Sequence, residues 1–431
     1  LASLLDGPPR DPSAPLTQRE ADIARSAQVV LEGIVLDIAR RAQALTGARN
    51  LCLAGGVALN CVANAKVREA GLFDDLWVQP AAGDSGGAVG AALWRWHQVD
   101  RRERVVRSGD APGAAVFLGP AFGDDEVATW LEGCGIPFER HEPEALVDEV
   151  AAALDGGATV GWFQGRMELG PRALGHRSIL ADPRRPDMIR RINALVKQRE
   201  PFRPFAPAVL AEHAAEWFEV DGPRPYMTEV AQVAAAQLRE PEAEPAGDFG
   251  AQLGAVRSTI PACTHVDGSA RVQTVHPDDE SFHRLLEAFH RRTGCPVLLN
   301  TSFNRAGEPI VRTPADAFRC FVAAGLDVWR LPPLGYTKSD EHHWAPGTMW
   351  LSYETLMSTL VDLGRSVAAT PARKLVFMNG HGGNTALLQV ANRELRRRFG
   401  LFDIHRRLSR WHNNDLRWVV VRWRVPARSP R

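Results

Sequence analysis

Basic side chains gather in two stretches of loop-like sequence, at residues 166–185 and 197–203. Glycines and prolines flank them, and apolar residues rather than acids and helix formers separate them. Arg forms forked, paired hydrogen bonds with phosphate or carboxylate, and Lys contributes a point charge. The pattern predicts a pocket for a small anion, with a solvated surface loop as the alternative. The cations are Arg166, Arg172, Arg177, Lys197, Arg199 and Arg203.

Two glycine-rich turns, at residues 55–60 and 83–87, could also bind phosphate. Each stands between a predicted strand and a helix, where glycines let backbone N–H groups approach an anion and the helix N-terminus favours it. The pair predicts a nucleotide held between the turns, with Asp84 free to ligate a bridging metal. Tight turns without a ligand are the alternative. The binding candidates are Gly55, Gly56, Asn60 and Gly86.

Two further groups carry weaker signals. Ser302 and Asn304 follow a strand predicted to end at Leu299, where a hydroxyl and an amide could meet a ligand at the carboxyl edge of a sheet. Turn formation by Asn300 and Asn304 is equally compatible with the pattern. In a separate stretch, residues 264–271, alternating His and Asp residues are predicted to share one strand face, with a paired core histidine as the alternative. The ligand-binding candidates there are His265, Asp267 and Arg271.

One histidine stands where a metal ligand is often found. His381 follows a predicted strand and precedes a predicted helix, within an Asn-Gly-His-Gly-Gly-Asn run. A zinc or manganese centre needs about three protein ligands, so this residue alone does not make a site.

Composition narrows the class of protein. The 431 residues carry 51 Lys and Arg against 51 Asp and Glu, which excludes a protein that binds nucleic acid mainly through a high positive charge. No apolar run reaches the roughly 18–20 residues of a membrane span, and the first residues do not resemble a signal peptide. The six cysteines form no C-x-x-C pair, which favours buried thiols in a reducing cytoplasm.

The elements that must position these residues follow from apolar periodicity. Helical spacing from Gln18 to Ala44 predicts a long amphipathic helix, and short apolar runs at 51–54 and 76–78 predict strands that enter the glycine-rich turns. Helical patterns follow at 58–70 and up to about residue 97. Residues 101–113 lack any period and indicate a domain linker.

The rest of the chain predicts a second domain and a third segment. The second domain contains a helix, turn and strand at 150–163, a basic loop at 166–185, a helix at 187–196 and a strand at 295–299. A helix begins at Thr313-Pro314. The third segment has a helix at 352–368, a strand at 374–378 and a helix at 385–399, and we expect no regular structure from residue 403 onward.

Most of the chain resembles the O-carbamoyltransferases of the nodulation and antibiotic-biosynthesis type. The resemblance runs from Gln18 to about Val328 and rests on long motifs in the family's order. They occupy residues 53–60, 83–88, 161–175, 197–207, 264–271 and 300–304.

The resemblance implies an α/β fold with two catalytic modules. Residues 1–105 would form the second half of an actin-like ATPase domain, and residues 114–330 a YrdC-like α/β domain. The YrdC-like module of such enzymes joins carbamoyl phosphate and ATP into carbamoyl adenylate and releases pyrophosphate, and the actin-like module transfers the carbamoyl group to a hydroxyl of a small acceptor. Lys197-x-Arg199 and Ser302-x-Asn304 match the motif that binds nucleotide and carbamate, and Arg166 and Arg172 join the first pair as expected catalytic cations.

Two departures accompany this resemblance. The preceding half of the actin-like domain, with its His-x-x-x-His motif, has no counterpart, so Asp84 would be the remaining ligand for Mg, Fe or Mn. Residues 331–402 resemble a fragment of the creatininase-type amidohydrolases, in which only His381 carries over as a Zn or Mn ligand. Residues 403–431 match neither family, and we expect an unstructured or frame-shifted tail there.

The sequence therefore predicts a cytoplasmic, ATP-dependent carbamoyltransferase that uses a divalent metal. Its expected partners are carbamoyl phosphate and a small hydroxyl acceptor, with neither nucleic acid nor membrane. A metal-dependent creatininase-type amidohydrolase and a non-catalytic fusion of two gene fragments are the alternatives.

Overall fold

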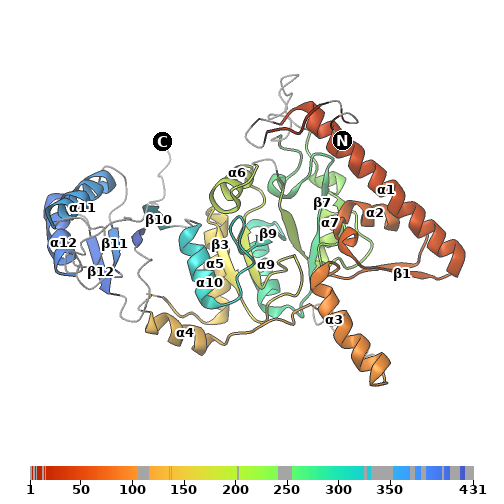
Figure 1. Ribbon diagram of the computed structural model, residues 1–431, viewed down its shortest axis with the longest axis horizontal. Helices are drawn as coiled ribbons and strands as arrows, with labels where there is room; N and C mark the ends of the chain where they lie inside the picture. Colours follow the sequence, from red (N-terminus) through yellow and green to blue (C-terminus); the bar gives the residue numbers. More distant parts are fainter. Residues whose placement is uncertain are drawn as a thin grey trace. The chain divides into compact units, whose positions relative to one another are not determined.

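The computed structural model divides the chain into two compact units, shown in Figure 1. One contains Leu1–Phe122 and His141–Thr313, and the other contains Gly123–Arg140 and Pro314–Arg431. The structure describes residues 16–104, 116–134, 136, 138–200, 203–240, 255–324, 328–331, 353–368, 374–379, 385–399, 402–407 and 418–422, with short pieces before residue 16. The mixed α/β composition agrees with the class expected from the sequence.

The first module of the larger unit has a two-stranded parallel sheet packed against helices. Its α1 starts with a capping box, in which the Thr17 hydroxyl and backbone N–H both donate to Glu20, and ends at Gly47 in the left-handed conformation. Its elements are α1 (Gln18–Thr46), β1 (Asn50–Leu53), η1 (Gly56–Leu59), α2 (Cys61–Glu69), β2 (Asp75–Val78), α3 (Asp84–Trp94) and η2 (Arg95–Val99).

The second module of the same unit is built on a five-stranded mixed sheet. The strand order is β3-β4-β9-β5-β8, with β5 and β8 parallel and the other neighbours antiparallel. The sheet strands are β3 (Val160–Phe163), β4 (Arg177–Ala181), β5 (Ala206–Leu210), β8 (Gln273–Val275) and β9 (Val297–Ser302), and a short pair is formed by β6 (Ala231–Gln232) and β7 (Ser269–Ala270).

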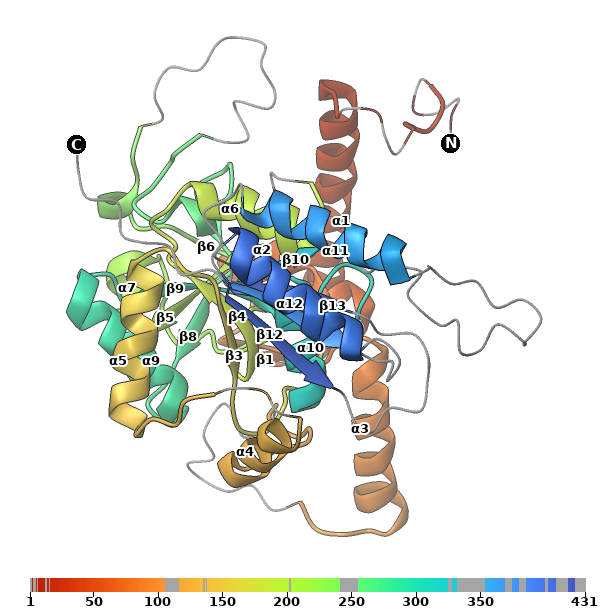
Figure 2. The same cartoon turned by 90° about the vertical axis from the view of Figure 1, so that its left-hand side faces the viewer.

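Helices α5 and α9 lie side by side next to this sheet, as Figures 1 and 2 show. They contribute Leu154, Phe282, Leu285 and Phe289 to one buried apolar core with strands β5 and β9. The helical elements of this module are α5 (Pro143–Asp155), α6 (Asp187–Ile192), η4 (Asn193–Lys197), η5 (Ala211–His213), α7 (Ala214–Trp217), η6 (Ala235–Gln237), η7 (Pro261–Cys263) and α9 (Glu280–Thr293).

The smaller unit has its own four-stranded sheet, in the order β10-β13-β11-β12. Figure 2 shows α11 and α12 lying together beside this sheet, and Leu356, Leu360 and Leu395 are buried between and beneath them. The elements are α4 (Asp124–Gly133), α10 (Pro314–Ala323), β10 (Val328–Leu331), α11 (Tyr353–Ala368), β11 (Lys374–Asn379), α12 (Thr385–Phe399), β12 (Phe402–Arg407) and β13 (Trp418–Arg422).

Most predicted elements are found within a few residues of their expected bounds, and two expectations are wrong. The stretch 166–185 is not loop throughout, because β4 occupies Arg177–Ala181 and all its residues are buried. Part of the expected structureless tail forms strands, since β12 pairs with β11 and β13 pairs with both β10 and β11. The predicted linker falls largely on residues outside the described ranges.

Candidate functional site

A pocket of about 320 Å³ opens in the larger unit where β9 ends and β5 begins. Its wall comes from both modules, because Cys61 at the start of α2 faces residues of the second module. A volume of this size accommodates a small ligand. The lining residues are Cys61, Pro171, Arg172, Ala173, Arg199, Arg203, Pro204, Phe205, Ala206, Met227, His265, Arg271, Asn300, Thr301 and Ser302.

The lining of this arginine pocket contains four arginines, Arg172, Arg199, Arg203 and Arg271, together with His265, and no Asp or Glu. Burial lowers the pKa of Arg172 and of Arg199. Burial, followed by the neighbouring charge of Arg172, lowers the pKa of Arg271 to about 10. These guanidinium groups are desolvated and repel one another, so an anion in the pocket would be strongly favoured.

Two of the arginines lack partners that would neutralise them. Arg271 Nε is buried without a hydrogen bond. Within the part of the chain that the structure describes, Arg172 has neither a hydrogen bond nor an ion pair. Buried polar groups in folded proteins are almost always paired, so these side chains indicate a ligand that completes them.

The motifs at 197–199 and 302–304 meet beside the pocket. Lys197 is buried, and its Nζ donates to Ser302 O at 2.5 Å, Ser302 Oγ at 3.0 Å and Asn304 Oδ1 at 2.7 Å. Gln198 adopts the left-handed conformation, with φ at 43°, at the end of η4. This turn lets Lys197 tie down the end of β9 while Arg199 lines the pocket. Lys197 itself holds the site rather than lining it.

Arg172 is placed by a loop that Glu168 organises. Glu168 is buried, and its Oε1 accepts hydrogen bonds from the backbone N–H groups of Leu174, His176 and Arg177. The loop approaches the first module so closely that a Cβ at Gly170 would lie 3.0 Å from the Pro80 carbonyl oxygen. Gly170 has φ at 123°, a conformation that glycine adopts without strain.

Two predicted cations lie away from the pocket lining. Arg177 is fully buried, and its guanidinium donates to the carbonyl oxygens of Gln164, Gly165, His176 and Pro120. The exposed Arg166 donates to the carbonyl oxygens of Phe117 and Leu118. In this conformation both side chains bind neighbouring backbone.

The 264–271 motif folds as a turn, so the expectation that His265 and Asp267 share a strand face is wrong. Gly268 N–H donates to the His265 carbonyl, and Asp267 accepts from the backbone N–H and hydroxyl of Ser269. The short polar side chain of Asp267 therefore stabilises the turn. His265 and Arg271 line the pocket, and Asp267 does not.

The two glycine-rich turns of the first module lie together, because β1 and β2 are parallel neighbours. Gly55 has φ at 98°, and its N–H donates to the Ala82 carbonyl. The Asn60 side chain caps α2 through Ala63 N–H and pairs with Gln28. Gly86 is packed tightly, since a Cβ there would lie 2.2 Å from the Ala81 oxygen. The N–H groups of Gly55 and Gly86 and the Asn60 side chain are thus engaged in the turns themselves.

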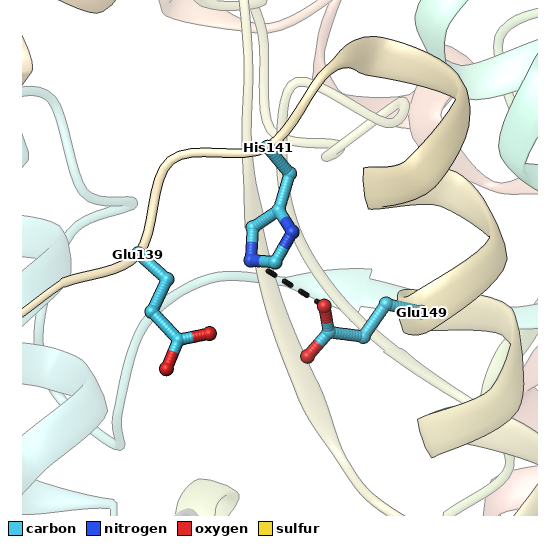
Figure 3. A group of neighbouring side chains, drawn as sticks. All are labelled: Glu139, His141 and Glu149. Atoms are coloured by element: carbon cyan, nitrogen blue, oxygen red, sulfur yellow. Dashed lines mark ion pairs between the residues drawn. The ribbon is translucent and has the colours of Figure 1, made fainter.

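Potential metal ligands gather in two groups among the described residues, and Asp84 belongs to neither. Asp84 is exposed in the first turn of α3. Glu212 and Glu287 flank His283 in one group. In the other, His141 points toward Glu149, as Figure 3 shows; His141 Nε2 lies 3.4 Å from Glu149 Oε2, and His141 is half-buried. His381 lies outside the described residues.

The sequence did not single out several pocket residues. Cys61 and Met227 each carried no recognised motif, yet both line the pocket, and Met227 has φ at 56°. Asn300 stands inside β9 rather than in a turn, and its amide donates to Ala173 O and Gln273 Oε1. Its buried Oδ1 has no partner. The strained backbone of Met227 is visible only in three dimensions.

Comparison with known proteins identifies the class. Residues 10–93 match the family model "Carbamoyltransferase N-terminus" and residues 151–338 match "Carbamoyltransferase C-terminus". Residues 308–428 match "Creatinine amidohydrolase". The chain therefore belongs to the carbamoyltransferase family through its first two parts and carries a creatininase domain after them.

Curated relatives narrow the resemblance further. The chain is 52% identical over 331 residues to the uncharacterized protein sll1178 of Synechocystis, covering 76% of this chain and 54% of that protein. It is 43% identical over 319 residues to nodulation protein NolO of Bradyrhizobium diazoefficiens (73% and 54%) and 36% identical over 315 residues to nodulation protein U of Sinorhizobium fredii (72% and 49%). The chain spans about half the length of these relatives.

Proposed function

We propose that this chain is an ATP-dependent O-carbamoyltransferase that acts in small-molecule biosynthesis. In its first reaction carbamoyl phosphate and ATP give carbamoyl adenylate and pyrophosphate, and in its second the carbamoyl group passes to a hydroxyl of a small acceptor. The observation that carries this proposal is the arginine pocket, whose charged side chains are all basic and partly unpaired.

The residues of this pocket suit phosphate-bearing substrates. Arg172, Arg199 and Arg271 would bind the phosphoryl oxygens and stabilise charge that develops on them. Lys197 would act as a positioning residue, because its ammonium group donates hydrogen bonds to Ser302 and Asn304 but does not line the pocket. ATP fits this donor set, since guanidinium groups bind phosphate oxygens in pairs.

The described residues around Asp84 do not form a site for the metal that the sequence predicted there. Asp84 has no second carboxylate or histidine gathered with it there. We therefore route no step through a metal at Asp84. A Mg ion accompanying ATP would be brought with the nucleotide.

The two carbamoyltransferase parts are proposed to have actin-like and YrdC-like architectures, and the acceptor hydroxyl is assigned to the first. We place the protein in the cytoplasm, which the absence of a disulfide among the described cysteines supports. None of the helices within the described ranges combines the length and apolarity needed to cross a membrane.

The test is carbamoyl-phosphate-dependent exchange of labelled pyrophosphate into ATP by the purified chain. We expect exchange in the wild type and a loss of at least about tenfold in Arg172→Met, because the variant removes an unpaired pocket cation. Arg292→Met is the matched control, since Arg292 lies on the surface of α9 and pairs with Asp155. Absence of exchange in the wild type would refute the first reaction.

A further inference from the structure

Most residues of the 226–230 segment, which belongs to the second module, contact the first module. Tyr226 packs edge-on against Trp77 with ring centroids 5.5 Å apart. Asn64 Nδ2 donates to the Thr228 carbonyl at 2.9 Å, and Val230 N–H donates to the Cys61 carbonyl at 3.3 Å. The 226–230 segment is thus attached to the first module at successive positions.

An ion pair strengthens the same attachment. Arg68 Nε lies 2.5 Å and Arg68 Nη2 lies 3.1 Å from the two carboxylate oxygens of Glu229. The Glu229 side chain is only 6% exposed, so water screens this bidentate pair weakly. On the other side, Arg224 forms two hydrogen bonds with Thr274 in β8, which anchors the chain entering the segment to the second module.

Met227 is the one residue in this segment that lines the arginine pocket. It is buried with Leu174 and Ala206, and Ala206 also lines the pocket. Its φ of 56° lies in the left-handed region, which a long side chain with a Cβ adopts only when its surroundings impose it. The surroundings here are the contacts of Tyr226, Thr228 and Glu229 with the first module.

We infer that the 226–230 segment couples the first module to the arginine pocket, with Met227 as a positioning residue. Contacts with Trp77, Asn64 and Arg68 hold Met227 in its left-handed conformation and so set the wall that faces the cations. When those contacts weaken, the backbone at Met227 relaxes and the pocket loses its shape for an anion. This inference deepens the proposed function, and it rests on that function only for the identity of the anion.

Cys61 gives a readout that needs no substrate. Its thiol lines the same pocket as Arg172 and Arg271. Iodoacetate is anionic and iodoacetamide is neutral, so the ratio of their alkylation rates at Cys61 reports how well the cations converge there. Cys52 and Cys134 are exposed elsewhere and serve as internal controls in the same peptide mass-spectrometry experiment.

The experiment weakens the attachment at Trp77 and Arg68, two residues that do not line the pocket. Trp77→Leu and Arg68→Met are made separately in the full chain, and each is combined with Met227→Ala and with Met227→Gly. Both substitutions at 227 remove the same side-chain wall, but only glycine adopts the left-handed conformation without strain. If only the Met227 side chain mattered, and not its backbone conformation, the Ala and Gly variants would give the same result.

We expect the iodoacetate-to-iodoacetamide ratio to be higher at Cys61 than at Cys52 and Cys134 in the wild type. It should fall in Trp77→Leu and Arg68→Met, together with the affinity for inorganic pyrophosphate measured by calorimetry. With Met227→Gly in these backgrounds both quantities should exceed those with Met227→Ala by about fivefold, the size of one left-handed backbone penalty.

Either of two results would overturn the coupling. One is an unchanged Cys61 ratio and pyrophosphate affinity in both Trp77→Leu and Arg68→Met, and the other is equal behaviour of the Ala and Gly variants. The proposed function fails separately, if labelled pyrophosphate does not exchange while the Cys61 ratio still follows this order. If pyrophosphate binding is too weak to measure, the alkylation ratio alone decides.

Discussion

Replacing Arg271 by Met should stabilise the protein when no anion is present. Burial and the charge of Arg172 lower the pKa of Arg271 to about 10 from its ordinary value above 12. At about 1.4 kcal/mol per pKa unit the charged form is disfavoured by up to roughly 3 kcal/mol. Because part of the side chain reaches solvent, we reduce this to about 1 kcal/mol.

The pH window follows from the direction of this pKa change. The folded-state pKa lies below the unfolded one, so the penalty is complete at every pH below about 10 and fades only as the pH rises above it. At pH 7 we therefore expect Arg271→Met to unfold at a higher urea concentration than the wild type. Saturating pyrophosphate should reverse this order, because the anion stabilises the form that binds it.

Urea unfolding followed by tryptophan fluorescence, in a buffer free of phosphate and sulfate, compares the proteins without anion and with added pyrophosphate. Arg292→Met is the control and should change the free energy of unfolding by less than about 0.5 kcal/mol. The reasoning is refuted if Arg271→Met is less stable than the wild type without anion and pyrophosphate stabilises both proteins equally.

Three other predictions follow from single contacts. Lys197→Met should lower the free energy of unfolding by about 2 kcal/mol, because it removes the hydrogen bonds that the buried Lys197 donates to Ser302 and Asn304; an unchanged urea midpoint would contradict this. Burial lowers the pKa of His265, so anion-free stability should fall as the pH drops below about 6.5, whereas pyrophosphate affinity should rise there and lose this pH dependence in His265→Gln. Replacing Ile34 and Ile38 by Gln should reduce self-association in light scattering, since the two side chains are 52% and 63% exposed on α1; equal particle sizes would count against it.

The sequence predicted the elements in which apolar residues repeat at a clear period. It missed β4, in which polar side chains are buried. The helix from Gln18 and the strand leading to Asn300 were found because apolar residues repeat at the right spacing. Strand β4 was missed because it begins with Arg177 and Ser178, which read as loop residues. They are buried because backbone carbonyls satisfy the guanidinium and the Gly175 N–H donates to Ser178 Oγ.

The sequence predicted that basic side chains gather in one place, but it did not predict all the residues that line the pocket. Arg172, Arg199 and Arg271 were recognisable because Arg in a rigid loop is a strong chemical signal. Cys61 and Met227 carry no such signal, since what places them in the pocket is the contact between the modules. A one-dimensional pattern contains neither that contact nor the left-handed φ at Met227.

The basic character of the pocket depends on where the acidic residues that are close to its lining in sequence place their side chains. Glu168 accepts hydrogen bonds from three backbone N–H groups, Asp267 stabilises the turn before Ser269, and Glu229 forms an ion pair with Arg68. Each acid stands within a few residues of a pocket residue, yet none lines the pocket.

These acids therefore hold the scaffold while Arg172 and Arg271 stay unneutralised, which explains how a chain with no net charge can present a concentrated positive site. It also follows that Glu168→Gln would act on the pocket by loosening the loop that carries Arg172 and not by changing the charge of the lining.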